Sequence, residues 1–119
     1  MRKIMALLSV LFVVIMIGAS AKAANESYAR IITGLSFSGT TATCSLKVYA
    51  EHTTDTIVAT VTLKHGSTTV KQWTNLTDYG ILDFSDTASV SYGETYTMQI
   101  MLTINGSPYP VADITRTCN

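Results

Sequence analysis

The feature that most constrains this chain is a strict alternation of apolar and polar residues between positions 95 and 104. Every even position in this run is apolar, and every odd position is polar except Met101. A period of two places all the apolar side chains on one face of a β-strand, whereas a helix would scatter them around its axis. The run therefore predicts a strand with one buried face and one solvated face. The residues expected on the buried face are Tyr96, Met98, Ile100, Leu102 and Ile104.

The same period recurs along the chain after residue 24, and no helical period competes with it. It is clearest at residues 42–50 and 56–64. Gly66 and the pair Asn105-Gly106 supply the positive φ angles that tight hairpin turns need. Further strands are expected at 28–33 and 35–38, separated by Gly34, and at 69–75, 81–84, 88–90 and 110–118, with a loop at 76–80.

About seven short strands separated by turn signals are typical of an all-β domain. We predict an antiparallel two-sheet sandwich of the immunoglobulin or fibronectin III kind. A closed barrel is the alternative, because periodicity does not distinguish the two architectures.

The first 23 residues have the composition of a helical, cleavable signal peptide. Arg2 and Lys3 precede a largely apolar run without charges from Ile4 to Gly18, and small residues follow it. A retained membrane anchor is the alternative, but a spanning helix needs about 20 apolar residues and this run is shorter. We expect cleavage after Ala23 or Ala21, which leaves one domain over residues 24–119. We expect that domain to be secreted, in the medium or at the cell surface, without a membrane anchor.

Removal of the leader changes the charge of what remains. The chain has eight basic and eight acidic residues, and Arg2, Lys3 and Lys22 lie in the leader, so the rest is net acidic. An acidic domain without a basic stripe is a poor nucleic-acid binder. We therefore expect no nucleic-acid partner, and a monomer.

The two cysteines, Cys44 and Cys118, are candidates for a disulfide. An even pair in an exported chain is commonly oxidised. The alternative is two reduced thiols, one of them buried in a strand.

Two aromatic side chains are candidate binding residues. Trp73 is the only tryptophan, and Tyr79 follows it closely. Such rings stack on sugars or anchor protein partners. The alternative for Trp73 is a core or rim position, because small β-domains need large side chains to fill their interior.

Gly93 and Tyr96 have the arrangement of a tyrosine corner. A glycine turn precedes a tyrosine that begins a strongly alternating strand. In Greek-key sandwiches the hydroxyl of such a tyrosine bonds to nearby backbone. We expect a structural role for both residues.

The sequence contains no recognisable catalytic or metal-binding motif. His52 and Asp55 share a loop, but their spacing fits no zinc pattern, and His65 lies at a turn. Asp83 and Asp86 are close in sequence, but a small sandwich has little cleft in which to hold a sugar between them. We expect no catalytic residue, no metal, no cofactor and no enzymatic activity.

Three short motifs carry a resemblance to known proteins. They are Ala42-Thr43-Cys44, the Val-x-x-Trp of residues 70–73 and the Gly-x-x-Tyr of residues 93–96. With these motifs the chain resembles a family of small secreted proteins of unknown function from Gram-positive bacteria. The resemblance implies export and an immunoglobulin- or fibronectin-like domain, without an established activity.

Taken together, these features favour a non-enzymatic binding module. Its partner would be a protein or a glycan at or near the bacterial cell surface. A secreted bacteriocin-like or inhibitor protein, also small, exported and all-β, is the alternative. Fold alone does not choose between them.

Overall fold

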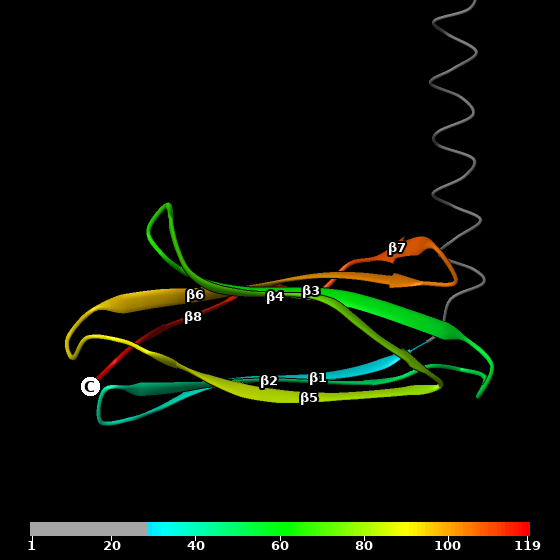
Figure 1. Cartoon of the computed structure of the whole chain (residues 1–119), viewed down its shortest axis with the longest axis horizontal. Helices are drawn as coiled ribbons and strands as arrows, with labels where there is room; N and C mark the ends of the chain where they lie inside the picture. The colour runs from blue at the N-terminus through cyan, green and yellow to red at the C-terminus, as the bar shows by residue number, and fades with distance from the viewer. Residues whose placement is uncertain (1–28) are drawn as a thin grey trace, which may run out of the picture.

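A computed structural model describes residues 29–119 of the chain, and the predicted signal peptide lies outside these residues. The described part consists of strands and connections, without a helix. Its strands form two layers packed face to face (Figure 1). The strands are β1 (Arg30–Ser38), β2 (Thr41–Tyr49), β3 (Thr56–His65), β4 (Thr68–Tyr79), β5 (Ile81–Ser89), β6 (Thr95–Ile104), β7 (Ser107–Tyr109) and β8 (Ile114–Thr117).

Every strand pairing in the two sheets is antiparallel. Sheet A has the order β1-β2-β5, and sheet B has the order β4-β3-β6-β7, with β8 also paired to β6. Strands β7 and β8 pair with opposite ends of β6, so together they occupy one place in the sheet. Sheet A therefore has three strand positions and sheet B has four. This is the division of strands in a fibronectin III-like sandwich. The predicted fold class is confirmed.

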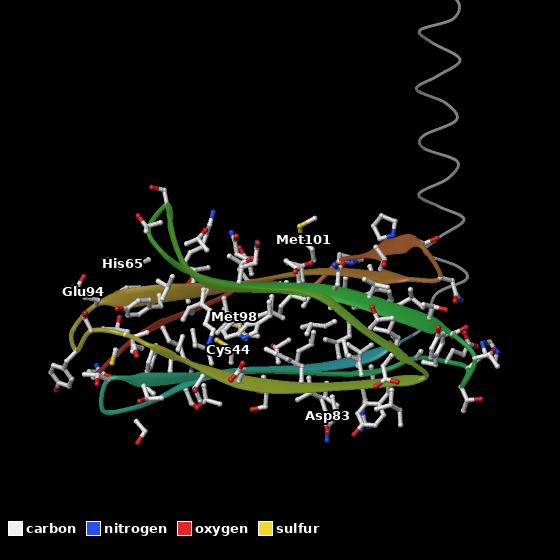
Figure 2. All side chains as sticks on the ribbon, in the orientation of Figure 1. Cys44, His65, Asp83, Glu94, Met98 and Met101 are labelled. Carbon is white, nitrogen blue, oxygen red and sulfur yellow. The ribbon has the colours of Figure 1, made fainter. Side chains whose placement is uncertain are left out.

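The core lies between the sheets and follows the predicted alternation. The even-numbered residues 96–104 of β6 are all buried, whereas Met101, the exception on the outer face, is 75% exposed. Figure 2 shows Met98 and Cys44 between the layers, with Met101 and Asp83 pointing away from opposite outer faces. Most other inward residues expected in the clearest runs are also buried: Ala42, Cys44, Leu46, Val48, Ile57, Ala59, Val61 and Leu63. There are two exceptions, because Ala50, expected inward, is only partly buried and Thr62, expected outward, is buried.

The predicted loop at residues 76–80 is wrong. Strand β4 continues to Tyr79, and only Gly80 separates it from β5 in the other sheet. The ladder between β3 and β4 shifts register twice, and Asn75 has a positive φ of 57°. These irregularities bend the strand and change its direction, so that it passes from sheet B to sheet A without a loop (Figure 1).

Two other predicted interruptions are absent, and the last predicted strand is shorter than expected. Strand β1 runs through Gly34, and β5 is continuous from Ile81 to Ser89. Both strands are held by uninterrupted pairing with β2. Of the last predicted strand, 110–118, only Ile114–Thr117 form a strand, β8. A separate short strand, β7, precedes it and contains Pro108, while Pro110, which cannot donate to a ladder, follows the end of β7.

The predicted Asn105-Gly106 turn is confirmed. It joins β6 to β7, with φ angles of 54° at Asn105 and 80° at Gly106. Two consecutive positive φ angles are the mark of a type I′ hairpin turn, whose twist matches that of the flanking strands.

The expected disulfide is absent, because Cys44 and Cys118 are both free and buried. The Cys118 thiol donates to the Gly39 carbonyl at the β1–β2 turn, at 3.2 Å. Cys44 lies opposite Leu35 and three residues inside β2. It is therefore about 10 Å along β2 from the first residue of that strand. A disulfide needs Cα atoms within about 7 Å of one another. The two residues therefore fill different levels of the core.

Candidate functional site

Trp73 closes the gap between the two sheets on their β4–β5 side. Its half-buried ring packs edge-on against Phe84 of β5, with ring centroids 5.3 Å apart. The indole nitrogen donates to the Asp86 carboxylate at 2.8 Å. The Lys71 ammonium lies 5.3 Å from the centre of the Trp73 ring. These contacts occupy the edge and one face of the ring, so Trp73 makes packing contacts and is a poor candidate for a free binding surface.

The Asp86 carboxylate is held ionised by its own neighbours. A hydrogen bond from the Thr87 backbone, together with the bond from Trp73, lowers the pKa of Asp86 below its usual value, and nearby Lys71 acts in the same direction. The ammonium of Lys71 also donates to the Thr87 carbonyl at 3.1 Å. This side of the sandwich is therefore joined by polar contacts between β4 and β5.

Two exposed apolar side chains flank Gly80, where β4 passes into β5. Tyr79 is 64% exposed, and Ile81, two residues later, is 52% exposed. Ile81 lies opposite Tyr49 of β2 on the outer face of sheet A. We call Tyr49, Tyr79 and Ile81 the junction surface. Two aromatic rings and a branched aliphatic side chain are the kind of group that anchors a partner.

Charged groups border the junction surface. The Arg30 guanidinium lies 4.8 Å from the centre of the Tyr49 ring, in cation–π contact. The Lys47 ammonium lies 3.4 Å from the Asp83 carboxylate. The hydrogen bond to this carboxylate, together with its charge, raises the pKa of Lys47 above its usual value. A partner would meet an apolar centre with charges of both signs at its margin.

The backbone beneath the junction surface is tied on both sides. Gly80 donates to the Asp55 carbonyl at 2.9 Å and accepts from the Ala50 nitrogen at 2.8 Å. Its φ is +76°, and an added Cβ would lie 2.9 Å from the Thr53 Cα atom. Only glycine fits this position without displacing the 50–55 loop, so Tyr79 and Ile81 are presented by a constrained turn.

Asp55 in turn anchors the 50–55 loop. Its carboxylate accepts from the Asn105 side chain at 2.9 Å and from the His52 backbone nitrogen at 3.0 Å. These two bonds hold the pKa of Asp55 below its usual value. Asn105 also accepts from the Thr56 nitrogen at 2.9 Å, so the loop is fastened to the β6–β7 turn.

The histidines and the paired carboxylates considered for chemistry do not converge. His52 pairs with Asp55, and His65 lies 2.8 Å from Glu94 (Figure 2). Asp83 sits opposite Lys47 on the outer face of sheet A, whereas Asp86 sits opposite the inward-facing Cys44. Among residues 29–119, no group of three or more His, Cys, Asp or Glu side chains could hold a metal ion.

Tyr96 and Gly93 lie together at the opposite end of the sandwich. The buried Tyr96 ring packs against Phe37 and His65, and its hydroxyl accepts from the Ser91 nitrogen at 2.7 Å. Gly93 has a φ of 88° and donates to the carbonyl of Cys118. These contacts fasten the β5–β6 connection and the C-terminal residues to the core.

Sequence reasoning singled out Tyr79 but missed Tyr49 and Ile81. Tyr49 has an outward position in a strand whose inward face was recognised, and Ile81 begins β5 on the same outer face. The available signal was an apolar residue at a position that the alternation places on the outer face, because exposed apolar side chains mark interaction sites. Their adjacency depends on the pairing of β2 with β5, which periodicity does not predict.

Within residues 29–119, the structure has a hollow that the sequence does not predict. A shallow groove of about 310 Å³ lies between β1 and the β7–β8 connection. None of its lining side chains is charged: Ala29, Ile31, Thr33, Tyr109, Pro110, Val111 and Ala112. The Tyr109 hydroxyl donates to the Ala29 carbonyl at 3.1 Å, and this bond links two of the residues that line the groove.

Comparison with known proteins assigns this sandwich to no family. No family model matches the chain, and no curated protein matches it. Residues 29–119 include no helix with the length and apolar character needed to cross a membrane. The resemblance to small secreted Gram-positive proteins remains a prediction.

Proposed function

We propose that the chain is a secreted, non-enzymatic binding module that acts at or near the bacterial cell surface. The junction surface is the observation that carries this proposal. Tyr79 and Ile81 are more than half exposed, although the core between the sheets is filled without them. Exposed aromatic and aliphatic side chains that the fold does not use for packing mark interaction sites.

The chemistry of the junction surface fits a partner with flat apolar faces and polar edges. The tyrosine rings offer stacking area, and the bordering Arg30, Lys47 and Asp83 offer hydrogen bonds of both polarities. A cell-wall glycan or a surface protein has this character. Because Gly80 constrains the turn beneath, such a partner would be bound with little ordering of the backbone.

Binding of the purified protein to cell walls of the producing organism tests the proposal. We expect Tyr79→Ala and Ile81→Ala each to weaken binding about tenfold. Tyr92→Ala is the matched control, because Tyr92 is 69% exposed and lies in the β5–β6 connection, away from the β4–β5 junction. Equal effects of the Tyr79 and Tyr92 variants, or a wild type that does not bind, would contradict the proposal. Growth inhibition of related bacteria without wall binding would favour the inhibitor alternative.

A further inference from the structure

The four edges of the two sheets are not equally protected against pairing with another strand. An unprotected edge presents free N–H and C=O groups to any strand that reaches it. In sheet B, β4 is irregular in register, and the opposite edge is divided into β7 and β8 beside two prolines. In sheet A, β5 is bonded to β4 through Trp73 and Asp86. The ammonium of Lys71 donates to the Thr87 carbonyl of β5, so that this carbonyl already has a partner.

Strand β1, at the other edge of sheet A, has none of these protections among the described residues. Its nine residues pair with β2 in one unbroken register and include no proline and no positive φ. Its only charged residue is Arg30, at its first position. Ile32 is 50% exposed on its outer face. A long, regular and nearly uncharged edge of this kind is a template for strand addition.

The sequence of β1 is complementary to itself when two copies run antiparallel. Gly34 is the middle residue of the strand, and a two-fold axis at Gly34 matches the strand over its full length. On the inner face, this register sets the half-buried Ile31 against the partner's Phe37 and Thr33 against the partner's Leu35. On the outer face, it sets Ile32 against the partner's Ser36.

Charge and shape agree with this register. Antiparallel pairing places each Arg30 opposite the partner's Ser38, so the two guanidinium groups lie at opposite ends of the contact. Pairs of aromatic and β-branched residues such as Ile31 with the partner's Phe37 stabilise neighbouring strands. Ile31 also lines the uncharged groove beside β1. The ring of the partner's Phe37 would therefore meet an apolar surface, where it is favoured over a charged group.

We propose that β1 is the contact strand of a symmetric dimer, in which the β1 strands of two copies pair antiparallel about Gly34. The two sheets A then form one continuous sheet. The contact is isologous, because both copies use the same strand. Ile31 meets the partner's Phe37, and Phe37 meets the partner's Ile31. This dimer takes the place of the monomer expected from the sequence, and it is independent of the binding function proposed for the junction surface.

Sedimentation equilibrium of the protein purified from cells that produce the full chain tests the dimer. The double variant I32E/S36E places two carboxylates opposite each other twice across the two-fold axis. We expect it to raise the dimer dissociation constant about tenfold or more, because like charges directly opposite each other repel. The variant I32E/S36K sets opposite charges at the same positions, and we expect it to dimerise as well as the wild type.

The matched control is I81E/S85E on β5. Ile81 and Ser85 have the same identities, spacing and outer face as Ile32 and Ser36, and Ile81 is exposed to the same degree as Ile32. We expect this control to leave the dimer unchanged. Circular dichroism and thermal melting establish that each variant is folded.

Three results would overturn the proposal. The first is a wild type that stays monomeric up to about 1 mM. The second is a control that dissociates as fully as I32E/S36E, which would move the contact to β5. The third is failure of I32E/S36K to restore the dimer, which would exclude the register about Gly34.

Discussion

The indole of Trp73 in sheet B donates a hydrogen bond to the carboxylate of Asp86 in sheet A. The two atoms are 2.8 Å apart, and the bond links the two edge strands on the same side of the sandwich. The chain thereby uses its one tryptophan to join its sheets. The same contact explains why Trp73 should be tested as a packing residue before it is tested as a binding residue.

Truncation of Trp73 should destabilise the fold. We expect Trp73→Ala to lower the free energy of unfolding by about 2 kcal/mol, because the ring's contact with Phe84 is lost and a cavity opens between the sheets. Trp73→Phe should have a smaller effect, since it keeps an aromatic ring and loses the bond to Asp86. Urea denaturation followed by circular dichroism measures both. Tyr79→Ala is the control and should change stability by less than about 0.5 kcal/mol; a Trp73→Ala variant as stable as this control would exclude a packing role.

Removal of the Tyr96 hydroxyl should also destabilise the fold. We expect Tyr96→Phe to lower the free energy of unfolding by about 1 kcal/mol, because the Ser91 nitrogen loses the acceptor that lies 2.7 Å away. Tyr92→Phe is the matched control, since Tyr92 is largely exposed in the same connection. Equal midpoints for the two variants in urea would show that the Tyr96 bond contributes nothing to stability.

Two glycines with positive φ should respond differently to the same substitution. Gly93→Ala adds a methyl group with no neighbour within 4 Å, so we expect only the backbone penalty of about 1 kcal/mol. Gly80→Ala adds the same penalty and a clash with the backbone of Thr53 at 2.9 Å. Gly80→Ala should therefore have the lower melting temperature. The reverse order would mean that the 50–55 loop yields easily and that the junction surface is not constrained.

The two cysteines should behave as buried thiols. Burial, with a smaller contribution from Asp86, raises the pKa of Cys44 to about 11 from an ordinary value of 9.0. We expect both thiols to resist alkylation by iodoacetamide at pH 8 in the folded protein and to react in denaturant. Mass spectrometry counts the modified residues, and an equal mass with and without reductant confirms that no disulfide is present. Rapid alkylation of Cys44 in the native protein would contradict its buried position.

The raised pKa of Cys44 also predicts a loss of stability at high pH. The folded state keeps the Cys44 proton to a higher pH than the unfolded state does. Stability is therefore unaffected by this group below pH 9 and falls as the pH rises from about 9 to about 11. Cys44→Ala removes this contribution, so its midpoint in urea should vary less than that of the wild type across this range. Parallel pH profiles for the two proteins would contradict the prediction.

Sequence reasoning succeeded where the signal is local. The alternation in β6 identified Tyr96, Met98 and their even-numbered neighbours as core residues, and Asn105-Gly106 identified a hairpin turn. Both signals depend only on residues near each other in the chain. Reasoning failed at residues 76–80, where pairing with β3 overrides the turn preference of Asp78 and keeps the segment in a strand.

The candidate site was only partly accessible from sequence. Tyr79 was identified because it is aromatic and close to Trp73 in the chain. Tyr49 was not, because it meets Ile81 through the pairing of β2 with β5, over 30 residues apart in the chain. The prediction of a disulfide was wrong for the same reason. No local signal shows that Cys118 contacts Gly39 rather than Cys44.

The sequence alone determined most of the side chains that face the core in β2, β3 and β6, because a period of two separates the faces whatever the strands pair with. The tertiary structure alone decided which strands are neighbours, where β4 leaves one sheet for the other, and which edges are covered. These outcomes depend on distances in space between residues that are far apart in the chain. Only the packed sheets bring Trp73 to Asp86, or leave β1 with a regular edge.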